Sequence, residues 1–271
     1  MNTTNPLAEQ PLSMAARKLP KPQVTNMIAV ASGKGGVGKT WFSITLAHAS
    51  AQSGLKTLLF DGDLGLANID IQLGLMPMYD LGSVIAGKAT LNQAVHHYED
   101  GNFDIIAGRS GSGSLAAIPP SSLQNIADDL RVLAKGYDRV IVDLGAGVDR
   151  SIRMFASMAA ELMIVCTDEP TSLTDAYAFI KMICTEQQKP RIHIVVNSAN
   201  SPREGERTYA TLLKACHGFL HIDPPLAGVI RRDTRVRDSI RNQTPILIRN
   251  PNAEAAEDVI NITRRLNREQ D

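Results

Sequence analysis

The sequence predicts an α/β fold, a mostly parallel and doubly wound sheet, and two observations lead to that class. From Met27 onward, short apolar runs alternate with helical stretches, which is the order that covers a parallel sheet on both faces. Several runs, such as Leu162–Cys166, are apolar throughout, as expected of strands buried on both sides. Ligands of such sheets bind at the carboxyl ends of the strands, so the residues after each strand are the candidates for chemistry.

The individual elements follow in order from these patterns. Met27–Ala31 is an apolar run before a glycine-rich turn, and the stretch after the turn reads as a helix. Later helices begin beside Pro119 and Pro251, because a first helical turn tolerates proline. The expected strands are 27–31, 56–61, 103–107, 138–143, 161–167, 191–197 and 225–230. The expected helices are 40–53, 119–135, 149–160, 172–187, 203–217, 233–241 and 252–268.

The amino-acid composition predicts two parts of the chain, an N-terminal arm and one folded domain. Residues 1–25 are expected to form a flexible N-terminal arm, because they combine four prolines with little apolar periodicity. Residues 26–271 are expected to form one domain, which includes the C-terminal helix 252–268. The 28 basic and 28 acidic side chains cancel, so no overall field favours nucleic acid. The three cysteines form no C-x-x-C pair and no apolar run could span a membrane, which predicts a cytoplasmic protein and disfavours a metal-cluster carrier.

The segment Gly33–Thr40 fits the G-x-x-x-x-G-K-[ST] pattern of a phosphate-binding loop, with a strand before it and a helix after it. Its glycines let backbone N–H groups turn toward one anion. Lys39 can reach the β- and γ-phosphates, and the Thr40 hydroxyl can ligate magnesium. The expected nucleotide-binding residues of the loop are Gly35, Gly36, Val37, Gly38, Lys39, Thr40 and Trp41.

Carboxylates follow two further strands and open on the same edge of the sheet as the loop. Asp143 follows the run Arg139–Val142, the Walker B arrangement in which an aspartate holds magnesium directly or through a water. After the second strand, Asp63 is the candidate that orients or deprotonates the attacking water, and Asp61 is expected to pair with a lysine; the reverse assignment of these two stays open. The expected magnesium site combines Thr40, Asp63 and Asp143.

A second lysine, Lys34, stands beside the first glycine, where the basic pattern requires none. With Asp61–Asn68 and Asp143–Gly147, the segment Lys34–Thr40 resembles the deviant Walker A ATPases of the MinD/ParA family, over residues 26–265. The resemblance implies a P-loop NTPase fold of that type, ATP and Mg²⁺ as cofactors, and a homodimer that sandwiches ATP.

In that family the extra lysine reaches the partner's phosphates, so the resemblance assigns this role to Lys34. Lys34 therefore joins Asp63 and Lys39 as an expected catalytic residue. An added cation at the phosphates supplies the charge that an arginine finger supplies elsewhere. Slow ATP hydrolysis that depends on dimerisation is expected.

Two segments, Thr167–Lys181 and Asn197–Gly205, resemble the family branch that sets flagellar number and placement in bacteria (FlhG/FleN). This implies a dimerisation switch whose partners are flagellar assembly or regulatory proteins. It also implies a cytoplasmic location that extends to the inner membrane or the cell pole. A division-site or DNA-partition ATPase of the same family is the alternative, and a nucleotide-binding scaffold without useful hydrolysis is another.

The resemblance also places adenine recognition at the ends of two strands. Asn197 matches an asparagine of the family, and its amide can donate to and accept from a purine edge. A strand-end amide satisfied by protein groups is the alternative. The second loop departs from the family's Gly-Val-Ile-Pro, because Arg231 follows Ile230. We expect the Arg231 guanidinium to stack on the base in place of the proline.

Two remaining features concern surfaces. Helix 252–268 carries an apolar stripe without aromatics, which favours packing against the domain over the membrane binding of many relatives. One zone is rich in arginine and could meet DNA, anionic lipid or an acidic protein, but the intervening Asp233 and Asp238 favour a solvated face. The arginines are Arg231, Arg232, Arg235, Arg237, Arg241 and Arg249.

Overall fold

Eight strands form one sheet in the computed structural model, which describes residues 21–108 and 118–268. The spatial order is β3-β4-β2-β5-β1-β6-β7-β8, and each neighbouring pair is parallel except β3 and β4. The mostly parallel sheet expected from the sequence is therefore confirmed. The strands are β1 (Val24–Ser32), β2 (Thr57–Gly62), β3 (His96–Tyr98), β4 (Phe103–Ile106), β5 (Arg139–Ala146), β6 (Ala159–Cys166), β7 (Arg191–Ala199) and β8 (Leu226–Arg231).

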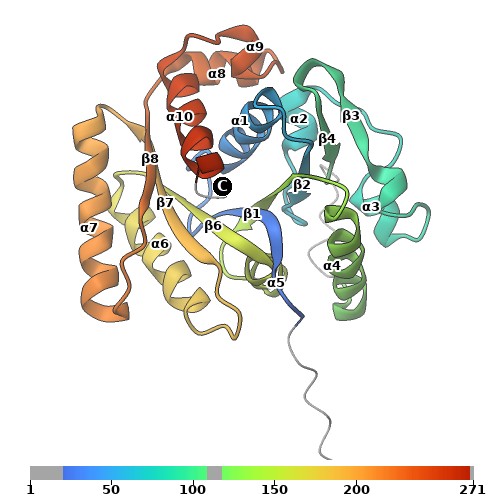
Figure 1. The fold of residues 1–271 in the computed structure, drawn as a ribbon, viewed down its shortest axis with the longest axis horizontal. Helices are drawn as coiled ribbons and strands as arrows, with labels where there is room; N and C mark the ends of the chain where they lie inside the picture. Colours follow the sequence, from blue (N-terminus) through green and yellow to red (C-terminus); the bar gives the residue numbers. More distant parts are fainter. Residues whose placement is uncertain (1–20, 109–117, 269–271) are drawn as a thin grey trace, which may run out of the picture.

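Helices cover both faces of the sheet, and each face closes its own apolar core (Figure 1). Phe42 and Val259 are buried on one face, and Phe155 and Phe179 on the other. The first face holds α1 (Lys39–Gln52), α2 (Ile69–Leu73), α8 (Thr234–Arg241), α9 (Ile246–Arg249) and α10 (Glu254–Arg268). The second holds α4 (Pro120–Ala134), α5 (Arg150–Met158), α6 (Pro170–Ile183) and α7 (Pro202–Leu220), while α3 (Leu81–Ile85) lies next to the end of β4.

Three strand ends meet at the centre of the sheet. β1 lies between β5 and β6, and β5 lies between β1 and β2. Asp143 of β5 is in register with Val30 of β1 and with Asp61 of β2. The phosphate loop and both acidic strand ends therefore open side by side, as parallel strands require.

The start of the described chain differs from the expected arm. β1 begins at Val24, earlier than expected, and the residues just before it contact α4. Lys21 pairs with Asp128 at 2.6 Å, and Arg131 donates to the carbonyl of Pro22. Residues 21–25 are thus attached to the domain, whereas the rest of the expected arm, residues 1–20, lies outside the described residues.

The C-terminal helix α10 packs against the domain, as its stripe suggested. Ala255, Val259, Ile262 and Leu266 are at most 3% exposed. Near the end of α10, Asn267 accepts a hydrogen bond from Arg139 at 2.8 Å. In residues 21–108 and 118–268, no helix has the length and apolar character needed to cross a bilayer.

Candidate nucleotide-binding site

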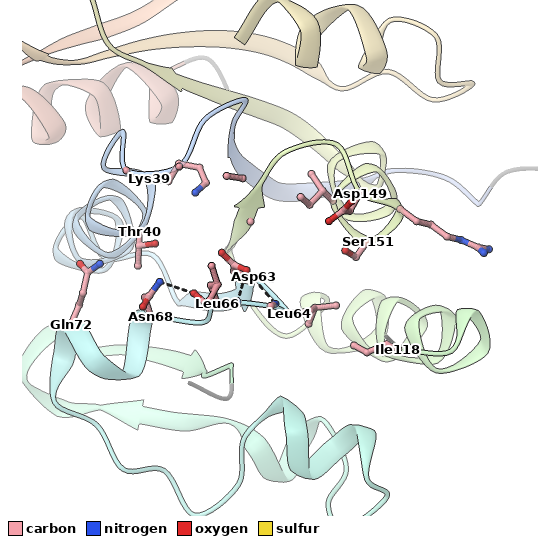
Figure 2. A pocket seen from close by; sticks show the side chains of 18 of the residues that line it. Lys39, Thr40, Asp63, Leu64, Leu66, Asn68, Gln72, Ile118, Asp149 and Ser151 are labelled. Carbon is pink, nitrogen blue, oxygen red and sulfur yellow. Dashed lines mark hydrogen bonds between the residues drawn. The ribbon is translucent and has the colours of Figure 1, made fainter. Parts of the chain in front are cut away.

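A pocket of about 720 Å³ opens at the carboxyl ends of β1, β2 and β5, and its volume is typical of small-ligand sites. Figure 2 shows Lys39 and Thr40 on one side of this pocket and Asp63 on another. Val37, the remaining loop residue expected to bind the nucleotide, is only 5% exposed and does not line the pocket. The expected residues that line the pocket are Gly35, Gly36, Gly38, Lys39, Thr40, Trp41 and Asp63.

Two close contacts hold the phosphate loop in its turn. Gly38 has a φ of 92°, in the left-handed region that favours glycine, and a methyl group there would lie 2.3 Å from Asn197 Nδ2. That same nitrogen donates to the carbonyl of Val37 at 2.7 Å. At the start of the loop, a Cβ on Gly33 would lie 2.2 Å from the backbone of Asp175 in α6. β7 and α6 therefore fix the loop from outside its own strand and helix.

Asn197 and Arg231, the residues expected at adenine, both have protein partners. Besides its bond to the loop, Asn197 accepts from the backbone N–H of Ser198 at 2.8 Å. Arg231 binds α10, with 2.9 Å from Nε to Asp258 and 2.8 Å from Nη1 to Glu254. Neither residue lines the pocket. Asn197 supports the loop in this structure, and Arg231 would have to leave these carboxylates to stack on a base, so adenine contacts stay predictions.

Asp143 lies behind the pocket wall and is 1% exposed. Its carboxylate accepts from the Ser43 hydroxyl at 2.9 Å, and the Thr40 hydroxyl also faces it. Burial raises the pKa of Asp143, while Lys39 and the two hydroxyls oppose that rise. Ser43 was not predicted as a site residue, although it stands three residues after Thr40 and hence on the same helix face.

Among residues 21–108 and 118–268, no lysine pairs with Asp61, so that expectation was wrong. The carboxylate is fully buried and accepts the backbone N–H groups of Asp63 and Asn68 at 3.2 Å and of Ile69 at 3.3 Å. Burial, followed by the charge of Asp143, raises the pKa of Asp61 to about 8. The chain turns back directly after β2, and its N–H groups occupy the place where a lysine was expected.

Asp63 stands at the pocket wall, held by the loop that Asp61 organises. One of its oxygens accepts from the N–H groups of Gly65 at 3.3 Å and Leu66 at 2.9 Å (Figure 2). These bonds fix the carboxylate where it faces the pocket. Further pocket-lining residues, which were not predicted, come from this loop, from α2 and from the start of α5. They include Leu66, Asn68, Gln72, Asp149, Arg150 and Ser151.

Lys34 does not line its own pocket. Its ammonium pairs with the Glu169 carboxylate and donates to the Thr171 hydroxyl at 3.0 Å. Both partners lie at the start of α6, and the lysine side chain is 37% exposed. The extra lysine of the loop is thus held on the outside of the phosphate cradle.

The donor set suits a hard divalent cation. The charge of Asp143 contributes to the raised pKa of Asp61, the charge of Asp63 contributes to the raised pKa of Asp143, and Lys39 is the cation that acts on Asp143. Mg²⁺ prefers oxygen ligands and keeps several of its waters. Thr40 and Asp63 face the pocket directly, whereas Asp143 lies behind it and would act through a water. The residues present therefore fit magnesium.

Family comparison agrees with this geometry. Residues 28–246 match the family described as the CobQ/CobB/MinD/ParA nucleotide binding domain. The chain belongs to this family. The resemblance to MinD/ParA proteins expected from the Lys34 loop is confirmed.

Several known proteins are similar to this chain in sequence or in structure. The chain is 36% identical over 230 residues to the antiactivator FleN of Pseudomonas aeruginosa, covering 85% of this chain and 82% of that protein. It is 32% identical over 221 residues to the flagellum site-determining protein YlxH of Helicobacter pylori, covering 81% and 74%. Among solved structures, the septum site-determining protein MinD of Pyrococcus horikoshii, complexed with Mg-ADP, matches with a TM-score of 0.75 at 25% identity, covering 89% and 96%.

Proposed function

We propose that this chain is an ATP-binding and ATP-hydrolysing switch that dimerises with ATP and regulates flagellar number or placement. The observation that carries the proposal is the position of Lys34. Its ammonium stays off its own pocket, bound to Glu169 and Thr171, and is available for the phosphates of a second subunit. A relative complexed with Mg-ADP supports ATP and Mg²⁺ as the cofactors.

Within one subunit, the phosphate loop and the two acidic strand ends have different proposed roles in ATP hydrolysis. Lys39 and the loop N–H groups bind the phosphates. Thr40 and, through a water, Asp143 would hold magnesium, which would neutralise charge on the phosphates. Asp63 accepts a proton from the attacking water as the water oxygen bonds to the γ-phosphorus. The bond from that phosphorus to the β–γ bridging oxygen breaks, and ADP and phosphate result. The bonds from Gly65 and Leu66 keep Asp63 oriented for that step.

Lys34 makes hydrolysis depend on dimerisation. Its pair with Glu169 is exposed to solvent, and such pairs contribute about 1 kcal/mol or less. Phosphates of a second subunit would therefore displace Glu169 at little cost. The Lys34 ammonium of each subunit would then complete the nucleotide site of the other subunit.

The flagellar role rests on the relatives. An antiactivator FleN and a flagellum site-determining protein match over most of the chain, so flagellar assembly or regulatory proteins are the proposed partners, met in the cytoplasm, at the inner membrane or at the cell pole. DNA partition is less well supported, because several arginines of the basic zone are paired with carboxylates. Arg231 pairs with Asp258, Arg235 with Asp233, and Arg249 with Asp238.

Light scattering with Lys34→Ala tests the switch. The variant should bind labelled ADP normally, because Lys34 is not in the pocket, but should stay monomeric with ATP and Mg²⁺. Lys135→Ala, an exposed lysine at the end of α4, is the matched control and should dimerise like the wild type. Normal ATP-dependent dimers of Lys34→Ala would remove the cross-subunit role.

Counting flagella tests the biological role. A strain that lacks the gene should show an altered number or position of flagella, and the wild-type gene should restore them. Lys34→Ala should not restore them. An unchanged flagellar pattern in a motile deletion strain would contradict the flagellar role and leave the ATPase switch to be assigned elsewhere.

A further inference from the structure

Large apolar side chains are exposed along the chain after the pocket loop. Met76 is 97% exposed, Met78 is 87% exposed and Ile71 of α2 is 52% exposed. Single exposed apolar residues are ordinary, but a group within one short segment marks a contact surface. Methionine side chains are flexible and polarisable, so they adapt to varied apolar partners.

Two exposed cationic side chains belong to α8, and the residues that follow α8 contact the turn after α2. The end of α8 packs against the turn after α2, because Gln243 donates to the carbonyl of Ile71 at 3.0 Å and its side chain also lies against Gly74. Arg237 and Arg241 of α8 are exposed, and neither forms an ion pair with another described residue. They are four residues apart, which puts them on one helix face.

Asp238 lies between these arginines in sequence, and its carboxylate is hydrogen-bonded by Arg249 of α9. Arg241 attracts that carboxylate through space but forms no ion pair with it. Arg237 and Arg241 therefore present positive charge on the exposed side of α8. We call Ile71, Met76, Met78, Arg237 and Arg241 the α2–α8 surface.

We propose that the α2–α8 surface is a docking site for an acidic amphipathic segment of a partner protein. Carboxylates of such a segment complement Arg237 and Arg241, since guanidinium groups bind carboxylates through paired hydrogen bonds. Its apolar side chains cover Met76 and Met78, as in helix-in-groove recognition. A protein segment suits this surface better than a bilayer, because electrostatic membrane binding draws on clusters of about four to eight basic residues.

The same two helices also form part of the pocket wall. Gln72 of α2 and Ile240 of α8 line the pocket, and each is the chain neighbour of a residue of the α2–α8 surface. A docked segment therefore contacts elements that also contact the nucleotide. Docking of a partner segment does not require the proposed ATPase switch. A dependence of docking on nucleotide would rest on that proposed function. Docking is therefore tested first without nucleotide.

Selection from a library of random helix-length peptides, displayed on phage and captured by the full-length chain, tests the proposal. Enriched peptides should combine apolar residues at helical spacing with Asp and Glu. Synthetic copies are then titrated by fluorescence anisotropy. Met76→Ser/Met78→Ser and Arg237→Glu/Arg241→Glu should each weaken binding about tenfold or more. Unchanged melting temperatures would show that these exposed changes leave the fold intact.

Matched changes elsewhere give the control. Val132→Ser on α4 removes an apolar side chain that is 68% exposed, and Arg203→Glu on α7 reverses an exposed charge. Both should leave peptide binding unchanged. A lack of enrichment, peptides without acidic residues, or equal binding by the surface variants would overturn the proposal.

The same variants also test two other possible occupants of the α2–α8 surface, a membrane and a second copy of this chain. Vesicles of phosphatidylglycerol and phosphatidylcholine that sediment the wild type but not the surface variants would assign the α2–α8 surface to a membrane. Loss of ATP-dependent dimers in Met76→Ser/Met78→Ser, measured by light scattering, would assign it to a second copy. Either result would overturn the partner-protein assignment.

Discussion

Gly38 is the residue at which the phosphate loop turns into α1. Alanine at this position meets two obstacles, a φ of 92° and the amide nitrogen of Asn197 at 2.3 Å. We expect Gly38→Ala to cost about 1–3 kcal/mol of stability, because backbone strain and a displaced neighbour add. Nucleotide affinity should fall about tenfold or more, since Val37 and the loop N–H groups shift with it. Urea unfolding and titration with labelled ADP measure the two effects.

Gly54 offers a control that separates strain from contact. It has a φ of 89° after the end of α1, and an added Cβ would meet nothing within 4 Å. Gly54→Ala should lose about 1 kcal/mol of stability and bind labelled ADP like the wild type. Equal loss of binding in both variants would contradict the role of the contact between Gly38 and Asn197.

The loop residues of the site could be predicted because a motif ties residue type to backbone geometry. Lys39 and Thr40 line the pocket as the phosphate-loop pattern requires. The surroundings of Asp61 could not be predicted, since its partners are backbone N–H groups that any residue supplies. The support of the loop by Asn197 depends on a contact between chain segments far apart in sequence, which no local pattern encodes.

Helix α1 contains a buried histidine. His48 is 3% exposed, and burial lowers its pKa from 6.5 to about 4. Between those values the unfolded chain takes up a proton that the folded chain does not, so stability falls as the pH drops from 6.5 to 4. The loss from this group amounts to about 3 kcal/mol when fully developed, from about 1.4 kcal/mol per pKa unit.

His48→Leu should remove this pH dependence while it keeps α1 packed against the sheet. Urea unfolding at a series of pH values should show the stability difference between His48→Leu and wild type growing toward pH 4 in favour of the variant. A constant difference for His48→Leu would contradict a buried neutral histidine.

Element prediction succeeded where the chain is periodic and failed where elements are short. The long helices and the buried parallel strands follow from apolar patterning, and their observed ends lie within a few residues of the expected ones. β3, α2, α3 and α9 were missed, because elements of three to five residues show too few positions for a period. Of these unpredicted elements, α2 matters most for function, since Gln72 lines the pocket and Ile71 belongs to the α2–α8 surface.

In the proposed switch, dissociation of the dimer depends on hydrolysis and hence on Asp63. Asp63→Ala removes the proposed acceptor for the proton of water but leaves Lys34, Lys39 and Thr40 in place. The variant should therefore bind ATP and form dimers that persist, with phosphate release reduced about a hundredfold or more, the scale of a lost general base. Light scattering over time and a phosphate-release assay measure persistence and turnover.

Two controls locate the effect. Asp63→Asn keeps an oxygen that can accept from Gly65 and Leu66, so its loop should stay ordered while hydrolysis is still lost. Asp129→Ala changes an exposed carboxylate on α4 and should hydrolyse ATP like the wild type. Undiminished phosphate release by Asp63→Asn would move proton acceptance to another group.

Trp41 gives the molecule a property of practical use. It is the single tryptophan of the chain, it is 5% exposed, and it lines the pocket directly after Thr40. It also lies against α2 and α8, beside Gln72 and Ile240. Indole emission excited selectively from the native chain therefore comes from one emitter, placed between the phosphate cradle and the α2–α8 surface, and both sites can be followed optically without attaching a dye.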